Sequence, residues 1–376
     1  MSTSISEFGA LKRFIELKNI YHKKNILLVT GKNSYSSCGA RDILEPILNK
    51  ENVVYFNDFD CNPKIIDAQL GVNIARKAKI EVIIAVGGGS VIDMAKLIKA
   101  LYSDPQKYYE IATGKLKIKK INIPIIAVPT TAGSGSEATH FAVVYIDSKK
   151  FSVSSPYLTP CRVVLDGELL ISGSSYLKTC NALDSLSQAI ESLWSKNANK
   201  DSRRISLNSI KICRDNIRSF IKGTNNPIIL QEMASASHLA GQAINITKTT
   251  APHAWSYAIT QNYKIPHGHA VWLTLPSIFQ LTLQYLSKKF YNELIPKSLY
   301  KEIKEMLELL EINDLTNSKN ILIKFLKNLN IEYDMKKLGI DTIEKRTYIS
   351  NQINIERMSN HPIELDKNDI RKIFEI

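Results

Sequence analysis

Short apolar runs alternate with helical patterns through the first half of the chain. The runs are rich in Ile and Val and have the length of buried strands, at residues 25–30, 53–56, 81–86 and 123–128. Helical patterns occupy residues 40–48, 63–78 and 91–101. In the second of these, one apolar stripe is formed by Ile65, Ile66, Leu70 and Ile74. This alternation predicts a parallel sheet flanked by helices, whose ligands bind beyond the carboxyl ends of the strands.

From about Ser175 the pattern changes, because strand-like runs disappear and helical spacing takes over. Apolar residues recur at this spacing at Leu183, Leu186, Ile190 and Leu193. From Lys288 onward the chain is rich in Lys, Glu, Asn and Leu, and a helical structure is predicted throughout. We therefore predict an α/β domain over residues 1–174 and an all-helical domain over residues 175–376.

The composition supports two globular domains and excludes several other classes of protein. The chain has 376 residues, of which 44% are hydrophobic and 23% charged, so wholesale disorder and a collagen-like structure are excluded. No apolar run approaches the ~20 residues of a membrane helix, and the N-terminus does not resemble a signal peptide. The five cysteines are scattered without a CxxC pair, which is typical of reduced thiols. We expect a cytoplasmic protein that does not bind membranes.

The net charge of +13 is compatible with nucleic-acid binding, but its distribution argues against it. The basic residues are dispersed, and no long basic block is interleaved with aromatic residues. We predict no nucleic-acid partner. Part of the charge would instead attract an anionic substrate or cofactor, unless it only reflects a Lys-rich composition.

Two loops that follow predicted strands have the composition of nucleotide-binding segments. Gly87-Gly88-Gly89-Ser90 opens a helix, so its backbone amides and the helix dipole would hold a phosphate. It is not the GxGxxG fingerprint, and a tight turn is the structural alternative. The loop at 129–139 concentrates hydroxyl and small residues and would wrap a nucleotide, unless it is only a solvent-exposed turn.

Four residues in the second half of the chain form a candidate divalent-metal site. Asp184 and Gln188 are four residues apart on a predicted helix and therefore project side by side. His253 and His267 would add two imidazoles and complete a site of mixed oxygen and nitrogen donors. The alternative is an ordinary helix-face Asp with histidines that have other hydrogen-bond partners.

Taken together, these motifs resemble the iron-containing (group III) alcohol dehydrogenase family. The features are GGGSxxDxAK at 87–96, PTTAGSGSE at 129–137, Asp184 with the following Ala-Ile-Glu, and His253 with Pro-His-Gly at 266–268. The resemblance implies a dehydroquinate-synthase-like fold, with a nucleotide-binding α/β domain and a helical metal-binding domain. It also implies a homodimer or larger homo-oligomer.

The resemblance assigns residues of the first half to an NAD(P)H cofactor. By position these are Asn62, Gly88, Gly89, Ser90, Asp93, Thr130, Thr131, Ser134 and Lys150. Members of the family that prefer NAD often carry Asp after the first strand, where this chain has Gly31 followed by Lys32. Loss of the carboxylate, with Lys32 attracting a 2′-phosphate, predicts that NADH and NADPH are both used.

The resemblance assigns the metal, Fe or Zn, to Asp184, Gln188, His253 and His267. The metal is expected to polarise an aldehyde oxygen during hydride transfer. Gln188 stands where most members have His, and Tyr257 where many have a second His. The catalytic proton is expected to come through His267, His269 or Tyr257.

Residues 136–145 and 248–257 resemble phosphonoacetaldehyde reductases within the family. This narrower resemblance implies a small anionic aldehyde as substrate. The phosphonate would be bound by His140, Lys248, Thr249 and Thr250. The alternatives are a reductase of lactaldehyde, another short aldehyde or a polyol, a dehydroquinate-synthase-like lyase, and a nucleotide-binding scaffold without metal.

Overall fold

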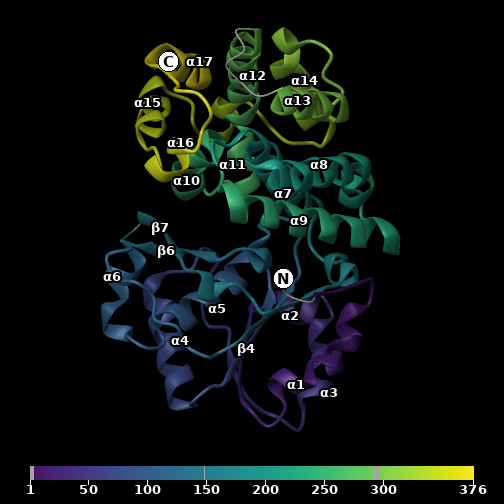
Figure 1. Cartoon of the computed structure of the whole chain (residues 1–376), viewed down its shortest axis with the longest axis vertical. Helices are drawn as coiled ribbons and strands as arrows, with labels where there is room; N and C mark the ends of the chain where they lie inside the picture. The colour runs from purple at the N-terminus through teal and green to yellow at the C-terminus, as the bar shows by residue number, and fades with distance from the viewer. Residues whose placement is uncertain (1–3, 148, 292–296) are drawn as a thin grey trace. The chain divides into compact units, whose positions relative to one another are not determined.

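The computed structural model describes residues 4–147, 149–291 and 297–376 (Figure 1). The chain forms two compact units, of which the first contains residues 1–174 and 223–241 and the second residues 175–222 and 242–376. The first unit is therefore discontinuous in sequence. Residues 223–241 are tied to it by close backbone packing of Gly135 against Gly241, and by a 2.8 Å hydrogen bond from Gly167 N to Gln231 Oε1.

The first unit contains a six-stranded parallel sheet with the order β1-β8-β5-β4-β2-β3. The four predicted strands are confirmed to within two residues at each end. The strands are β1 (Ser4–Ser6), β2 (Asn25–Thr30), β3 (Asn52–Phe56), β4 (Val82–Gly87), β5 (Ile125–Pro129) and β8 (Arg162–Leu165). β1 and β8, which were not predicted, extend the sheet on one side.

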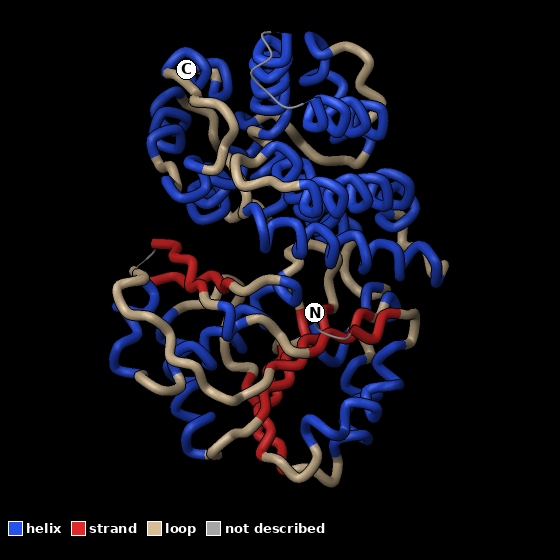
Figure 2. The backbone as a smooth tube through the Cα atoms, viewed as in Figure 1, coloured by secondary structure: helices blue, strands red, loops and turns tan. Residues whose placement is uncertain are grey.

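A two-stranded antiparallel hairpin lies outside this sheet (Figure 2). It consists of β6 (Phe141–Ile146) and β7 (Lys149–Ser154), with Tyr145 opposite Lys150. Neither strand was predicted. Alternate residues of β6 are only partly buried and β7 is largely polar, so neither strand contains the continuous apolar run that marks the central sheet.

Helices cover both faces of the parallel sheet. Within β2, Leu27 and Val29 belong to the apolar core shared with α4 and α5, whereas Ile26 and Leu28 belong to the core shared with η1 and α3. The α-helices are α1 (Lys18–Tyr21), α2 (Ser34–Ser37), α3 (Ala40–Leu48), α4 (Ile65–Lys77), α5 (Gly89–Leu101) and α6 (Tyr108–Ala112). The 3₁₀ helices are η1 (Ala10–Leu17), η2 (Pro105–Lys107), η3 (Ser136–Ala138), η4 (Pro156–Leu158) and η5 (Gly167–Leu170).

The apolar stripe predicted for α4 coincides only in part with its packed face. Ile66 is 65% exposed and Leu70 is 44% exposed. A Cβ at Gly71 would lie 2.6 Å from the Ile98 side chain, so small residues allow α4 to approach α5 closely. The buried residues of the helix are Ala68, Gly71, Val72 and Ala75. Ile65 and Ile74 of the predicted stripe do pack against the same core, so the prediction is confirmed for these two residues and wrong for Ile66 and Leu70. The closest packing of the helix depends on small side chains, which apolarity alone does not indicate.

Every regular element among the described residues of the second unit is a helix (Figure 2). α7 is buried over most of its circumference and forms the centre of this unit. The α-helices are α7 (Ser175–Trp194), α8 (Lys200–Ile221), α9 (Pro227–Thr247), α10 (Ala251–Tyr263), α11 (His267–Trp272), α12 (Leu275–Tyr291), α13 (Lys297–Leu309), α14 (Ser318–Asn328), α15 (Ile343–Asn351), α16 (Ile355–Ser359) and α17 (Lys367–Phe374). Two 3₁₀ helices, η6 (Leu315–Asn317) and η7 (Met335–Leu338), complete it, and α9 contributes residues up to Gly241 to the first unit.

None of the helices formed by the described residues has the length and apolarity required to cross a bilayer. All five cysteines are free thiols, and Cys180 and Cys213 are buried.

Candidate active site

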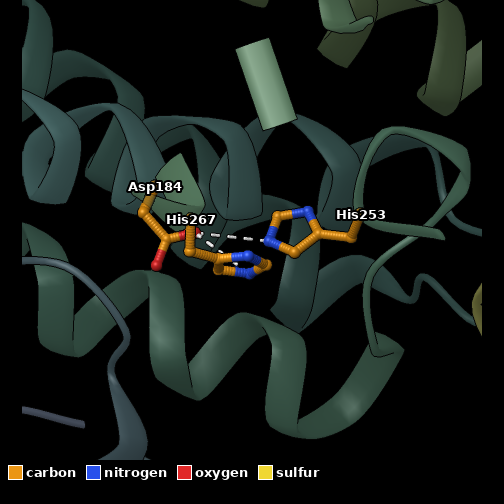
Figure 3. A group of neighbouring side chains, drawn as sticks. All are labelled: Asp184, His253 and His267. Atoms are coloured by element: carbon orange, nitrogen blue, oxygen red, sulfur yellow. Dashed lines mark ion pairs between the residues drawn. The ribbon is translucent and has the colours of Figure 1, made fainter. Parts of the chain in front are cut away.

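Three of the four predicted metal ligands converge in the second unit. Asp184 comes from α7, His253 from α10 and His267 from the first turn of α11. Each offers a ligand atom within 4.8 Å of the other two. His253 Nε2 lies 3.4 Å and His267 Nε2 3.9 Å from the same carboxylate oxygen, Asp184 Oδ1, so both imidazoles face this carboxylate (Figure 3).

The fourth predicted ligand, Gln188, lies one turn after Asp184 on α7. Its side chain is 4% exposed, and its Oε1 atom has no hydrogen-bond partner. The buried His253 Nε2 also lacks a hydrogen-bond partner. An unsatisfied buried polar atom costs about 1–3 kcal/mol, which a cation held between these donors would offset. One carboxylate, one amide oxygen and two imidazoles suit a divalent first-row metal, so the residues present fit such an ion.

Glu191 supports this donor set and was not among the predicted site residues. It is fully buried, and its Oε1 atom contacts His253 Nδ1 in a short hydrogen bond. Its Oε2 atom accepts hydrogen bonds from Thr250 N at 2.6 Å and Thr250 Oγ1 at 2.9 Å. A carboxylate behind a ligand imidazole fixes the tautomer and turns Nε2 toward the metal. The spacing along the sequence could have identified Glu191 as part of the site, since positions 184, 188 and 191 lie on one face of a helix.

The electrostatics of His253 show how strongly these carboxylates act. Burial alone would lower the pKa of the imidazole, but Glu191 and Asp184 outweigh it and raise the pKa to about 9. An imidazole that binds a metal must give up this proton, so metal binding here is coupled to proton release.

Tyr257 lies beside the donor set, as its position after His253 suggested. Its ring stacks on that of His267, with centroids 5.7 Å apart and planes 20° apart. Its hydroxyl accepts a hydrogen bond of 3.3 Å from Arg357 Nε. Arg357 is only 4% exposed and was not predicted as a site residue. A buried guanidinium therefore lies directly behind the aromatic neighbour of a predicted metal ligand.

His269, a predicted proton-relay residue, is buried and bound to the protein through both ring nitrogens. Its Nε2 atom donates to the Glu332 carbonyl at 2.7 Å, and its Nδ1 atom accepts from the Tyr176 hydroxyl at 2.9 Å. Burial lowers the pKa of its imidazole, which favours this neutral form. The geometry therefore gives no support to a relay role for His269 and leaves His267 and Tyr257 as the candidates.

The four residues predicted to bind a phosphonate differ from one another in exposure and in hydrogen-bond partners. Lys248 forms an ion pair with Glu356, and its side chain is 31% exposed. Thr249 and Thr250 are buried, and the hydroxyl of Thr250 is bound to Glu191. His140 belongs to the first unit and immediately precedes β6. Of the three residues in the second unit, Lys248 is thus the one with appreciable exposure.

In the first unit, the glycine turn and the hydroxyl-rich loop lie against each other. β4 ends at Gly87 and α5 begins at Gly89. A Cβ at Gly88 would lie 3.2 Å from Thr131 Oγ1, and one at Gly89 would lie 2.4 Å from Ser134 Oγ. A larger residue at either position would force these side chains to shift, so the glycines allow a close approach that brings hydroxyls of the second loop to the N-terminus of a 13-residue helix. A helix N-terminus of this kind is suited to a pyrophosphate.

Lys96, a buried residue of α5, holds the hydroxyl-rich loop and was missed as a functional residue. Its ammonium donates to the backbone carbonyl and hydroxyl of Ser136, to Thr139 Oγ1 at 2.9 Å and to the Phe141 carbonyl at 2.9 Å. Burial lowers the pKa of this lysine to about 8. Its place in the GGGSxxDxAK motif is therefore explained by support of the loop.

Asp93, predicted to bind the cofactor, uses both carboxylate oxygens for the same purpose. Oδ1 accepts a hydrogen bond from the Ser136 hydroxyl, and Oδ2 accepts one of 3.0 Å from Val143 N. The structure thus favours a positioning role for Asp93, one step behind the residues that face a ligand.

The remaining predicted cofactor residues lie near the same edge of the sheet or on the hairpin. Asn62 adopts a left-handed backbone conformation, and its amide donates to Ser90 Oγ at 3.3 Å. The loop after β3 is thereby joined to the glycine turn. Thr130 follows β5 directly, and Lys150 lies on β7.

Lys32 does not present an unpaired positive charge to a 2′-phosphate. Its ammonium lies 3.3 Å from Asp58 Oδ1 and 3.6 Å from Asp60 Oδ1. At the preceding position, a Cβ on Gly31 would lie 2.2 Å from Ser34 Oγ. The hydroxyl of Ser34 thus occupies the space in which an Asp side chain would begin.

Comparison with known proteins identifies the family. The profile described as iron-containing alcohol dehydrogenase matches residues 2–167, and the one described as the C-terminal part of the Fe-containing alcohol dehydrogenase family matches residues 179–376. The chain is 25% identical to long-chain-alcohol dehydrogenase 1 of Geobacillus thermodenitrificans (strain NG80-2), over 98% of this chain and 93% of that protein.

Solved structures show the same fold at low sequence identity. A 1,3-propanediol oxidoreductase superposes with a TM-score of 0.87 and 24% identity, over 99% of this chain and 97% of its own. A sulfoacetaldehyde reductase from Bifidobacterium kashiwanohense, in complex with NAD⁺, superposes with a TM-score of 0.85 and 23% identity, over 100% of this chain and 96% of its own. These comparisons confirm the predicted fold class, a nucleotide-binding α/β domain followed by a helical domain. The chain belongs to the iron-containing alcohol dehydrogenase family and is an oxidoreductase.

Proposed function

We propose that this enzyme reduces a small aldehyde to a primary alcohol at a metal centre formed by Asp184, Gln188, His253 and His267. The observation that carries the proposal is the pair of buried donors without hydrogen-bond partners, Gln188 Oε1 and His253 Nε2, beside the carboxylate of Asp184. Such an arrangement is unfavourable unless a cation is shared among the donors. Fe and Zn both suit this donor set.

When bound, the metal supplies a Lewis acid for the aldehyde oxygen and the reduced nicotinamide supplies the hydride. The chain's own residues do the remaining work. Glu191 holds His253 in one tautomer through Nδ1. Arg357 holds Tyr257 through its hydroxyl, and the ring of Tyr257 holds the imidazole of His267. His267 and Tyr257 are the residues nearest this centre that are able to deliver a proton to the product oxygen.

The cofactor is bound by the two loops of the first unit. Backbone amides at Gly88, Gly89 and Ser90 hold the pyrophosphate, since they begin α5. Hydroxyls of the loop that Lys96 and Asp93 hold in place add further donors, at Thr130, Thr131 and Ser134. A protein of the same fold, the sulfoacetaldehyde reductase, was solved in complex with NAD⁺, which supports a dinucleotide as the cofactor.

Within this activity, the substrate we propose is phosphonoacetaldehyde, whose product is 2-hydroxyethylphosphonate. Local sequence resemblance at 136–145 and 248–257 supports it. A relative named for sulfoacetaldehyde, another two-carbon aldehyde with an acidic group, supports the class of substrate. In the second unit, the ammonium of Lys248 and the guanidinium of Arg357 are cations that favour an anionic substrate.

A specific observation favours a second candidate, an uncharged short-chain aldehyde such as propanal or lactaldehyde. The charge of Lys248 is balanced by Glu356, and the hydroxyl of Thr250 is bound to Glu191. Two of the predicted phosphonate ligands are therefore already engaged with carboxylates. An uncharged substrate would need neither of them.

Steady-state kinetics with a panel of aldehydes separates the two candidates. A charge-assisted hydrogen bond contributes about 1.5–3 kcal/mol, so two such contacts predict a kcat/KM for phosphonoacetaldehyde at least about a hundredfold above that for propanal. Lys248→Ala should reduce this advantage and spare propanal, whereas Lys222→Ala, an exposed lysine of the same unit, should change neither. Equal efficiencies would exclude the phosphonate and leave an aldehyde reductase. Full turnover by rigorously metal-free protein would exclude the metal-dependent reaction itself.

A further inference from the structure

A small cavity among the C-terminal helices of the second unit has no role in the assignments above. Its volume is about 250 Å³. It is formed where η7 meets α15 and α17, two helices that pack against each other (Figure 1). Its inner wall consists of the buried residues Leu273, Ile373 and Phe374. None of the proposed metal donors lines it.

The lining of the cavity includes a buried guanidinium, that of Arg346 on α15. The residue is 7% exposed. Its Nε atom is buried without a hydrogen-bond partner, and its Nη1 atom donates a long hydrogen bond of 3.4 Å to the Asp341 carbonyl. Among the residues that the structure describes, no carboxylate forms an ion pair with this guanidinium. A buried charge without a counter-ion is costly, and an anion bound in the cavity would offset this cost.

The geometry of the guanidinium favours a carboxylate as this anion. Arginine binds a carboxylate through two parallel N–H bonds from one edge of its planar group, and the unpaired Nε of Arg346 belongs to such an edge. Tyr333 also lines the cavity, and burial, with a smaller effect of Glu375, raises the pKa of its hydroxyl to about 12. This hydroxyl lies 3.3 Å from Ser277 Oγ, so when Ser277 donates, the proton of Tyr333 is available to a ligand oxygen.

The charges around the cavity favour a ligand with a single negative charge. Asp334, Lys336 and Glu375 are exposed at its rim. Together with Arg346, the lining carries two positive and two negative charges, which leaves no net positive charge to attract a dianion. α17 also ends beside the cavity, at Phe374, and the last carbonyls of a helix carry partial negative charge. A dianionic phosphate is therefore disfavoured relative to a monocarboxylate.

The remaining wall suits a short aliphatic chain. Leu273, Ile373 and Phe374 belong to one apolar core of this unit, and Met335 packs against it. A cavity of about 150 Å³ is large enough for benzene, so the larger volume here has room for a carboxylate of about six carbons. The exposed rim gives such a ligand access from solvent.

We propose that this cavity binds a small aliphatic monocarboxylate, whose carboxylate pairs with Arg346 and whose chain lies against Ile373 and Phe374. The site goes beyond the proposed function and does not depend on it. It is formed by neither the metal donors nor the cofactor loops, so a carboxylate bound there is a second ligand of the enzyme.

Isothermal titration calorimetry of the full chain with sodium hexanoate, at constant ionic strength, tests this site. We expect saturable binding with a dissociation constant of about 1 mM or below. Hexanamide, which has the same shape without the charge, and inorganic phosphate should each bind at least about tenfold more weakly. Arg346→Gln should weaken hexanoate binding by about tenfold or more, as expected for the loss of a charge-assisted contact. Arg357→Gln removes a buried arginine beside the metal donors and should leave this binding unchanged.

A second variant and a second measurement cover the case in which Arg346→Gln does not fold. Met335→Trp fills the cavity and keeps Arg346, so it should also abolish hexanoate binding. In the unmodified protein, hexanoate should raise the Tm and hexanamide should not.

Three results would overturn the inference. The first is the absence of saturable hexanoate binding by the unmodified protein. The second is binding of hexanamide or phosphate that is as tight as that of hexanoate. The third is hexanoate binding that is lost in Arg357→Gln and kept in Arg346→Gln or Met335→Trp, because the carboxylate would then lie beside the metal donors.

Discussion

Replacing Glu191 with glutamine is the sharpest test of how the metal site is held. The variant preserves the size of a fully buried side chain and removes its charge. Glu191 uses one oxygen for His253 Nδ1 and the other for the amide and hydroxyl of Thr250. Glutamine has a single acceptor oxygen, so it is able to serve His253 or Thr250 but not both.

The expected effect follows from what the imidazole loses. Without a carboxylate on Nδ1, His253 is a weaker base, and its Nε2 atom is no longer fixed toward Asp184. Loss of such a partner typically weakens metal affinity by about 10–100-fold, or about 1.4–2.8 kcal/mol. The cofactor residues belong to the other unit, so the dissociation constant for NADH should change little.

Metal affinity is best measured by competition of Zn²⁺ or Co²⁺ between the protein and a chromophoric chelator. Glu137→Gln is the matched control, because Glu137 is also a buried carboxylate paired with an imidazole, that of His238 at 3.1 Å, in the first unit. Metal affinity unchanged within about twofold in a folded Glu191→Gln protein would refute the reasoning. An equal loss in the Glu137→Gln control would point to general destabilisation instead.

Two further predictions concern stability. Burial, with a smaller effect of Lys196, lowers the pKa of His361 to about 3. Between pH 6.5 and 3 the unfolded chain therefore binds one more proton than the folded protein, and the free energy of unfolding decreases by about 1.4 kcal/mol for each unit by which the pH is lowered. Chemical denaturation at pH 6.5 and 5.5 should show that His361→Gln loses less stability than the unmodified protein, and equal losses would contradict this. Lys96→Met removes the ammonium that donates to the carbonyls of Ser136 and Phe141, which keep weaker hydrogen bonds from Thr139. Loss of hydrogen bonds from a charged donor should cost about 1.5–3 kcal/mol of stability. Thermal denaturation should show a lower Tm and titration a weaker NADH affinity, and normal NADH binding would show that the loop does not depend on Lys96.

The central sheet could be predicted because its signal is local. β2, β4 and β5 are buried on both faces and therefore appear as continuous runs of Ile, Val and Leu. The hairpin of β6 and β7 has no such run, since two-thirds of its strand residues are only partly buried or exposed. The packed face of α4 depends on Gly71 meeting Ile98 of another helix, which is a contact between elements that periodicity does not report.

The candidate site also has features that the sequence predicts and features that it does not. The metal donors could be proposed from spacing and resemblance, because the chemistry of Asp, His and Gln restricts what they are able to bind. The contacts that Lys32, Lys248 and Thr250 make with carboxylates could not be predicted from the sequence. The partner carboxylates, Asp58, Glu356 and Glu191, are all distant from them along the chain. Sequence therefore indicated which residues carry charge, and only the structure indicates where that charge is already balanced.

The balance of charge around the metal site bears on the choice of substrate. Three carboxylates, Asp184, Glu191 and Glu356, accompany two cations, Lys248 and Arg357, so the group carries a net charge of −1 when His253 is neutral. A divalent ion changes this to +1. By this count an anionic substrate such as the proposed phosphonate would be repelled without the metal and attracted with it. The neutral oxygen of Gln188 contributes to this sign, because a carboxylate at that position would return the loaded site to zero. A neutral His, which most members of the family carry at this position, would give the same sign, so the charge balance requires a neutral donor at position 188 and does not depend on glutamine in particular.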